Sequence, residues 1–369
     1  MSIVLLLILC LGHALASDSC VVTEYDDVET ATASCQDLII NNLQVPAGVT
    51  LELSLRDGAT LTFVGNTTFG FENWSGPLMK VAGDDITIRG EPGHVLNGLG
   101  ELYWDGLGSW GTLKPRFMWI EVSNAVFRDI HIYHAPMHAI HLTNSTNVVF
   151  TDFLIDNADG AIGVAPYNHE GHNTDGFGVE LSHNITIKNS KIYNQDDCVA
   201  LNSGSNILVS NLLCHGSHGL SLSVGFSNDS FETNTLTDVV IEDSIIIDAM
   251  DGIHIKTHID AGEGIIRNVT YRNIFMIGSY EKGIAIEQNY TNTLSPGNGA
   301  EPRNNIPIQD LVFDNIRGTV LNTSVPYYIV CAKDGCLNWK WSDINVYGLL
   351  DSACVNYHPD VIDCVDYDR

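Results

Sequence analysis

Residues 184–213 read NITIKNSKIYNQDDCVALNSGSNILVSNLL, and this stretch contains the same pattern twice. Each copy begins with an asparagine, at Asn184 and at Asn206, and continues with an alternating apolar segment rich in Ile, Val and Leu. Alternation of apolar and polar residues with a period of two is typical of a short strand. Because Asn and Asp tolerate the left-handed backbone of a tight turn, the first residue of each copy fits a turn between strands.

The pattern recurs along most of the chain, with starts at Asp85, Asn124, Asn147, Asn184, Asn206, Asp238, Asn268 and Asp310. Two intervals are close to a bare repeat, 23 residues from Asn124 and 22 from Asn184, and the others, of 30 to 42 residues, fit one repeat plus a loop or two repeats. Short strands in a coil of this length predict an all-β, single-domain parallel β-helix. A β-propeller with mostly antiparallel blades is the alternative. Helical periodicity is scarce, and the one candidate segment lies around residues 32–42.

The first residues predict a leader. Residues 3–11 read IVLLLILCL, which is too short to span a bilayer, and the small residues Ala14 and Ala16 follow it as at a signal-peptidase site. We therefore expect a secretory signal peptide over 1–16 and a mature β-helix domain over 17–369, secreted and extracellular. A buried N-terminal strand is the alternative.

Cysteines and glycosylation sequons agree with a secretory route. Eight cysteines remain after the leader, in four local pairs: Cys20 and Cys35, Cys198 and Cys214, Cys331 and Cys336, Cys354 and Cys364. Local pairing is the simplest of the 105 possible connectivities, and buried free thiols are the alternative. Glycosylation is predicted at Asn66, Asn73, Asn144, Asn184, Asn228, Asn268 and Asn322. The sequon at Asn289 is left open, because a glycan there would crowd the neighbouring Tyr290.

Composition narrows the possible partners. The 369 residues are 44% hydrophobic, with 17 Lys and Arg against 45 Asp and Glu, a net charge of −28. The apolar content excludes wholesale disorder. The negative charge makes nucleic acid a poor partner, and no apolar run after the leader is long enough for a membrane span.

The polar clusters follow the same repeat length. Asp175 lies in HNTDGFG, Asp196 and Asp197 in NQDDC, and His218 in GSHGLS, with 21 residues from Asp175 to Asp196 and from Asp197 to His218. One coil apart, these side chains should stack at about 4.8 Å on one face. Crowded carboxyls raise at least one pKa, and a protonated acid beside carboxylates is what glycosidic hydrolysis needs. Solvated turn acids and a calcium site are the alternatives.

The motifs NTDGF, NQDDC, SHGLS and IKT, in this order and spacing, resemble the polygalacturonases of glycoside hydrolase family 28. The similarity starts near Trp104 and extends beyond IEQNY at 286–290, and it includes the cysteine pairs. It implies a right-handed parallel β-helix that degrades pectin in the plant cell wall. The reaction is inverting hydrolysis of α-1,4-galacturonosyl bonds, without metal or other cofactor. It also implies a monomer, with polygalacturonate as substrate and a plant inhibitor protein as a possible partner.

The resemblance assigns roles by motif. Asp196 corresponds to the general acid, Asp175 and Asp197 to the pair that holds the attacking water, and His218 to the residue that tunes the acid. Substrate-binding roles are implied for Asn173, expected to position groups around Asp175, and for His254, Lys256 and Tyr290. Lys256 would hold a substrate carboxylate as a point charge, and Tyr290 would support the sugar.

Two positions depart from the family pattern. His254 stands where the family has Arg before Ile-Lys, and Gly178 stands where active enzymes usually have Asp. Histidine lacks the bidentate fork of arginine and is only partly charged near neutral pH. Three interpretations follow: an active polygalacturonase, a hydrolase with a preference shifted to methylated or substituted pectin, or a non-catalytic protein that binds pectin or an inhibitor. Because a chain with a pI near 4.5 repels a polyanion less in acid, we expect an acidic pH optimum.

Two further groups have simpler explanations. His134, His138 and His141 have a spacing that resembles zinc ligands, but Pro136 interrupts any helix there, so no metal site is predicted. The aromatic residues of 103–118, namely Tyr103, Trp104, Trp110 and Phe117, are expected mainly to cover the apolar core rather than to stack on sugars.

Overall fold

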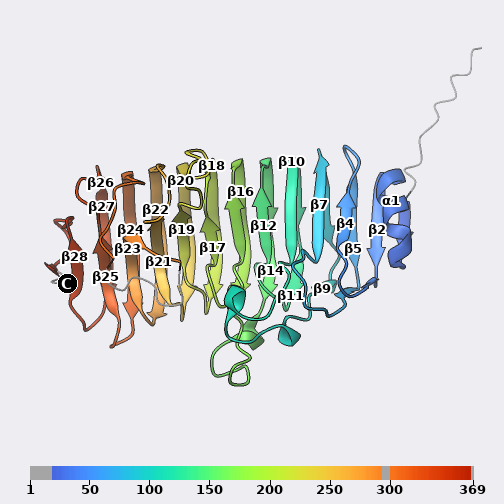
Figure 1. Ribbon diagram of the computed structural model, residues 1–369, viewed down its shortest axis with the longest axis horizontal. Helices are drawn as coiled ribbons and strands as arrows, with labels where there is room; N and C mark the ends of the chain where they lie inside the picture. Colours follow the sequence, from blue (N-terminus) through green and yellow to red (C-terminus); the bar gives the residue numbers. More distant parts are fainter. Residues whose placement is uncertain (1–18, 293–299, 367–369) are drawn as a thin grey trace, which may run out of the picture.

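The computed structural model describes residues 19–292 and 300–366, and these form a long parallel β-helix (Figure 1). All strand pairs of the described residues are parallel, and most strands pair with the strand one coil before and the strand one coil after. This pairing confirms the predicted β-helix and excludes the propeller. The predicted leader, residues 1–16, lies outside the described residues.

The coils have three faces, which we call A, B and C. Face A contains β4 (Leu51–Ser54), β7 (Met79–Asp84), the first half of β10 (Met118–Arg128), β12 (Ile140–Thr143), β15 (Phe177–Glu180), β17 (Val199–Leu201), β19 (Leu220–Val224), β21 (Asp251–His258), β23 (Lys282–Tyr290), β25 (Val325–Val330), β28 (Ser352–Val355) and β29 (Cys364–Asp366). Face B contains β1 (Ser19–Val22), β2 (Asp37–Asn41), β5 (Thr60–Val64), β8 (Thr87–Gly90), the second half of β10, β13 (Thr146–Thr151), and the first halves of β16 (Ser182–Tyr193), β18 (Gly204–His215), β20 (Thr235–Ile247), β22 (Ile265–Ser279) and β24 (Ile308–Val320), with β26 (Cys336–Leu337) and the start of β27 (Lys340–Tyr347). Face C contains β3 (Gln44–Val45), β6 (Asn66–Phe69), β9 (Val95–Asn97), β11 (His131–Tyr133), β14 (Leu154–Asp156) and the second halves of the long strands.

The repeat residues form the corner between faces A and B. All eight predicted starts, from Asp85 to Asp310, have positive φ between 50° and 58°. Their side chains stack: Asn147 donates an amide hydrogen to Asn124 at 2.8 Å, Asn184 to Asn147 at 2.6 Å, and Asn206 to Asn184 at 3.0 Å. An asparagine both donates and accepts, so it continues the ladder, whereas an aspartate only accepts and ends it. Among the described residues, no hydrogen bond joins Asn206 to Asp238, because the free oxygen of Asn206 and the carboxylate of Asp238 are both acceptors.

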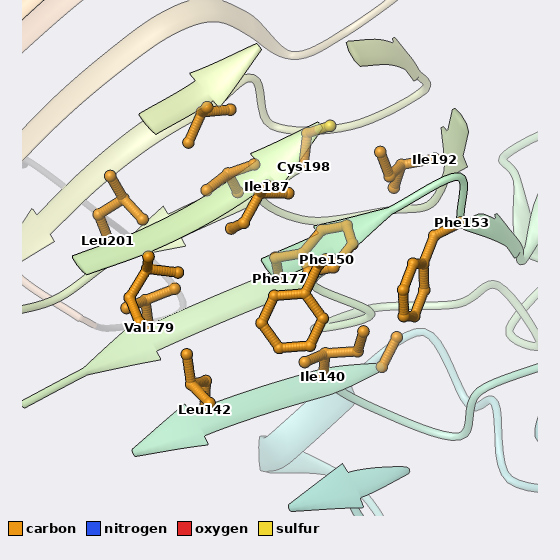
Figure 2. Close-up of a cluster of buried hydrophobic side chains, with 14 of the residues drawn as sticks. Ile140, Leu142, Phe150, Phe153, Phe177, Val179, Ile187, Ile192, Cys198 and Leu201 are labelled. Atoms are coloured by element: carbon orange, nitrogen blue, oxygen red, sulfur yellow. The ribbon is translucent and has the colours of Figure 1, made fainter. Parts of the chain in front are cut away.

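The interior is a continuous stack of apolar side chains (Figure 2). Phe150 lies between two other rings, with centroids 4.9 Å from Phe127 and 5.6 Å from Phe177. Leu142, Val179 and Leu201, which alternate with outward residues of face A, point into the same core and are at most 1% exposed. Buried side chains of this kind fix which side chains of face A must point outward.

A short helix covers the first coil. α1 (Val28–Ser34) buries Val28, Ala31 and Thr32 against the end of the stack. The helix predicted around 32–42 is therefore wrong over most of that range, because Asp37–Asn41 is strand β2 with alternating burial. The β-branched pair Ile39 and Ile40 favours the strand. The other helical turns are η1 (Tyr25–Asp27), η2 (Gly100–Leu102), η3 (Gly108–Trp110) and η4 (Ala158–Gly160). Among the described residues, none of the helices has the length and apolar character that a bilayer crossing demands.

The predicted disulfides are all present: Cys20–Cys35, Cys198–Cys214, Cys331–Cys336 and Cys354–Cys364. The seven sequons predicted to carry glycans are exposed, whereas Asn289 is 5% exposed. Of the four aromatic residues singled out, Tyr103, Trp104 and Phe117 are buried, as expected for core covering, and Trp110 is 55% exposed.

The ladder predicts an asymmetry between Asn and Asp. Asn206→Asp removes the donor to Asn184 and sets a carboxylate beside Asp238, while keeping a residue that tolerates positive φ. We expect a loss of about 1 kcal/mol in the free energy of unfolding, measured with urea. Asn168→Asp is the control, since Asn168 also has positive φ but lies in an exposed loop. Equal stability of the two variants would contradict the contribution of the ladder.

Candidate active site

Face A has small side chains at its centre. One outward row of aligned residues runs through His141, Gly178, Ala200, Ser221, His254 and Ala285. Between the two histidines, the row presents only Gly, Ala and Ser. A Cβ at Gly178 would meet no atom closer than 3.4 Å, so the backbone there would accept the aspartate that the family pattern predicts.

The three aspartates precede strands of this face and lie on neighbouring coils. The amide of Ala139 donates to the carbonyl of Asp175 at 2.8 Å, and the amide of Gly176 donates to the carbonyl of Asp197 at 2.9 Å. The amide of His218 donates to the carbonyl of Asp196 at 2.7 Å. The predicted stacking of Asp175, the Asp196–Asp197 pair and His218 on successive coils is therefore confirmed.

Asp196 is paired with a histidine. Its Oδ1 lies 3.2 Å from His218 Nδ1, and its Oδ2 accepts from the Asn173 amide at 2.9 Å. Asn173 thus contacts Asp196 rather than Asp175, around which it was expected to act, and its own oxygen accepts from the amide of Ser109 at 3.0 Å. Its positive φ of 54° turns the chain toward the carboxylate.

Asp197 is held by a lysine and a serine. Lys256 Nζ donates to both carboxylate oxygens, at 3.0 and 2.9 Å, and Ser221 Oγ donates to Oδ1 at 2.6 Å. The side chains of Lys256 and Asp197 are nearly buried, at 6% and 5% exposure. Burial opposes the charged form of Lys256, but Asp197 outweighs it and raises the pKa of the lysine. Lys256, expected to meet substrate, is thus bound to a carboxylate of the site.

Asp175 lacks such a partner. Its Oδ1 is buried without a hydrogen bond, and the closest basic atom, His138 Nε2, is 3.7 Å away. Burial, followed by the charges of Asp196 and Asp197, raises its pKa well above the usual range. Burial also lowers the pKa of His138 to about 4, and Arg116 adds to that effect, so this histidine is neutral and does not neutralise Asp175.

The Asp196–His218 pair carries one proton. Burial disfavours the imidazolium of His218, but Asp196 outweighs that and raises the histidine pKa to about 9. Burial of Asp196 is likewise outweighed by His218, which lowers the pKa of the carboxyl. The site therefore has the expected unequal carboxyls, with Asp175 as the one of raised pKa and the proton of the pair shared across a 3.2 Å contact.

His254 lies in a second buried cluster on the same face. Its Nδ1 is 3.1 Å from Asp251 and its Nε2 is 4.0 Å from Glu287, and the side chain is 4% exposed. Lys282 Nζ lies 3.1 Å from Glu287 and 3.9 Å from Asp251. Burial opposes ionisation of Glu287, yet His254 and Lys282 lower its pKa to about 2. Tyr290 lies between this cluster and the aspartates. Its ring centroid is 6.0 Å from that of His254 and 5.4 Å from Nζ of Lys256, which binds Asp197.

The sequence of residues 35–364 matches the family model described as "Glycosyl hydrolases family 28". A probable endopolygalacturonase I of Aspergillus terreus is 38% identical over 94% of this chain and 92% of its own length. A polygalacturonase of Phaedon cochleariae is 38% identical, over 95% of this chain and 94% of its own length. The chain belongs to glycoside hydrolase family 28. Among solved structures, endopolygalacturonase I from Stereum purpureum, complexed with two galacturonates, superimposes with a TM-score of 0.75 at 29% identity, covering 89% of this chain and 99% of that one.

A metal could in principle use the same atoms, since ligand atoms of Asp196, Asp197 and His218 lie within 4.8 Å of one another. In this family 28 chain, however, Lys256 and His218 already supply positive charge to the two carboxylates. Calcium takes six to eight oxygen ligands, and an imidazole nitrogen is a poor substitute. The donor set therefore fits acid–base chemistry better than the calcium alternative. The histidines with zinc-like spacing have separate carboxylate partners: Glu101 and Asp159 for His134, Asp175 for His138, and Glu180 for His141.

Sequence reasoning missed three residues of this site. Ser221 was within the quoted SHGLS motif, and its position 24 residues after Asp197 is close to one coil. His138 precedes Asp175 by one coil plus a loop, so the repeat length could have indicated it. Glu287 had no such signal, because its role depends on the buried contacts of His254 and Lys282.

We expect Asp175→Asn to lower the activity and to raise the stability of the folded protein. The substitution removes a buried like charge, so we expect the free energy of unfolding at pH 7 to rise by about 1–2 kcal/mol. A carboxyl with a raised folded pKa costs stability once it ionises, and costs nothing below its unfolded pKa of about 4. The gain should therefore disappear as the pH falls toward 4, measured by denaturation at several pH values. Asp57→Asn, at an exposed loop position, is the control, and a loss of stability at pH 7 would contradict the assignment.

Proposed function

We propose that this chain is a secreted endo-acting polygalacturonase that hydrolyses α-1,4-galacturonosyl bonds of pectin with inversion. Its membership of family 28 and the endopolygalacturonase names of its relatives support the reaction class. The observation that carries the proposal is the set of three aspartates on two successive coils, two with fixed cationic partners and one with a raised pKa. Four disulfides and the exposed sequons support secretion of a glycoprotein. Monomeric state follows from the family resemblance.

In the proposed mechanism, Asp196 donates a proton to the glycosidic oxygen as the bond to the anomeric carbon breaks. Water held by Asp197 and Asp175 attacks that carbon from the opposite side and loses a proton to the carboxylates. The product has an inverted anomeric centre, and His218, 3.2 Å from Asp196, returns a proton to the acid. Asp175 must be ionised to act as a base, so its raised pKa sets the acidic limb of the pH profile.

Substrate recognition in the proposal uses polar groups around the aspartates. Asn173 holds Asp196, Lys256 exchanges part of its contact with Asp197 for a substrate carboxylate, and Tyr290 supports the sugar ring beside it. No metal or other cofactor is required by these steps, and no nucleic acid or membrane partner is proposed.

A second candidate is hydrolysis of methylated or substituted pectin. His254 is 3% exposed between two acidic side chains, so it offers a uronate much less than an exposed arginine would. Asp251 and Glu287 disfavour a further carboxylate nearby, whereas a methyl ester carries no charge. A non-catalytic protein that binds pectin fragments or a plant inhibitor protein is the function that remains if no pectin is cleaved.

Asp196→Asn tests the proposed function. On demethylated polygalacturonate at pH 4–7, we expect wild type to release reducing ends and the variant to lose about 10²–10⁴-fold in kcat. Asp351→Asn, at an exposed position, should retain full activity. Release from esterified pectin alone would favour the second candidate, and no release from any pectin by folded wild type would overturn the proposal.

His218→Gln tests the shared proton. Because His218 has a pKa raised to about 9, it keeps one proton on the pair as the pH rises. Without it, Asp196 alone loses that proton at lower pH, so the alkaline limb of kcat/KM should move toward acid. An unchanged alkaline limb in the variant would contradict a proton shared between His218 and Asp196.

A further inference from the structure

A pocket of about 400 Å³ opens next to the first coils of face A. Two loops and three separate side chains line it. The lining residues include Ser75–Pro77, Ser109, Gly111–Lys114, Arg116, Trp119 and Met137. The mechanism above assigns no substrate contact to any of these residues.

The pocket is in line with the catalytic aspartates. The amide of Phe117, next to Arg116, donates to the carbonyl of His138 at 2.9 Å. The same backbone row continues from Ala139 to Asp175 and from Gly176 to Asp197. Arg116 therefore lies about three coils from Asp197, roughly 14 Å at the usual strand spacing. A pyranose ring is about as long as one such spacing, so a sugar chain lying along face A would reach the pocket a few rings away from the cleaved bond.

Arg116 is an unpaired cation. It forms no ion pair with any carboxylate of the described residues, although the chain has 45 acidic residues and only 17 basic ones. The other cation of the pocket differs: Lys114 is 4% exposed and donates to Asp105 at 2.9 Å and to the carbonyl of Gly108 at 2.8 Å. Lys114 thus holds its loop in place, while the guanidinium of Arg116 keeps its hydrogen-bond donors available.

Trp119 gives the pocket a flat apolar wall. The Arg116 guanidinium carbon lies 5.5 Å from its ring centroid, and the indole nitrogen donates to Glu121 at 2.7 Å. The ring also packs on the His141 imidazole, with centroids 4.2 Å apart. These contacts fix the indole so that it can take the C–H face of a sugar without first being ordered.

We propose that the pocket is a distal subsite for an anionic sugar ring, with Arg116 binding the ring carboxylate and Trp119 packing against the ring. A planar guanidinium binds a carboxylate through two parallel hydrogen bonds, which an ammonium cannot do. The subsite accounts for how a chain of net charge −28 holds a polyanion: it leaves an unpaired arginine beside the substrate path. The inference rests on the proposed function, because it assumes that the substrate is a polyuronate cleaved at Asp196.

The test compares Arg116→Gln with wild type on galacturonate oligomers from dimer to octamer. In wild type, kcat/KM should rise steeply once an oligomer is long enough to reach the pocket. In the variant that rise should shrink by about tenfold or more, the loss expected for a charged hydrogen-bonded pair. The shortest oligomers and kcat on long ones should be unaffected. Arg116→Lys should recover part of the loss, and Arg267→Gln, at an exposed arginine of face B, should behave as wild type.

Two further measurements separate the proposed subsite from the proposed function. On fully methyl-esterified oligomers, wild type and Arg116→Gln should be equal at every length, because no carboxylate is present. Identical length profiles of both proteins on uronate oligomers would overturn the subsite while leaving the proposed function intact. Failure of wild type to cleave any oligomer would instead count against the proposed function, and direct binding of an uncleaved octamer to Asp196→Asn, with and without Arg116→Gln, would still test the subsite.

Discussion

The parallel pairing of successive coils is the constraint on which the rest of the structure depends. Parallel pairing stacks equivalent residues one strand spacing apart. A residue type that recurs at the coil length therefore contacts another residue of the same type on the next coil. At the corner between faces A and B this is favourable, since asparagine amides both donate and accept along the stack. At the start of the face A strands the same stacking brings aspartates together, and like charges at that spacing are unfavourable.

The three aspartates have different partners that offset this repulsion, and the carboxyl groups therefore differ in their affinity for protons. Asp197 accepts hydrogen bonds from Lys256 Nζ on both oxygens, Asp196 has a histidine partner, and Asp175 has neither a lysine nor a hydrogen bond on its buried Oδ1. The Lys256 ammonium therefore offsets the charge of Asp197, Asp196 shares one proton with His218, and burial raises the pKa of Asp175. A mixture of protonated and ionised acids around one point is what an acid–base hydrolysis requires.

Much of this could be predicted from the sequence, because a repeat fixes both fold and register. The eight Asn and Asp repeat starts predicted the turn at the corner between faces A and B. The 21-residue steps predicted the alignment of Asp175, Asp196 and His218 on neighbouring coils. What could not be predicted depends on contacts between side chains distant in sequence. Lys256 binds Asp197 across 59 residues, and His254, although it lies in the outward row of face A, is buried beside Asp251 and Glu287. The unpaired state of Arg116 also has no local signal, since it depends on which acids fail to reach it.

The same distribution of charge explains how two departures from the family pattern fit the structure. His254 is surrounded by acids and a lysine that together form a buried cluster, and Gly178 leaves space in the row of small side chains above the core. Both positions lie beside the three aspartates rather than among them, and in the proposed function they act on sugar recognition and not on the acid–base groups.

The stereochemistry of the first product tests the central claim most directly. A general acid combined with two carboxylates that activate water, rather than attack the sugar, must invert the anomeric centre. Proton NMR of freshly hydrolysed polygalacturonate, recorded before mutarotation, should show the β-anomer of the new reducing end appearing first. Appearance of the α-anomer first would mean retention through a covalent intermediate, and would contradict the account of how these carboxylates work.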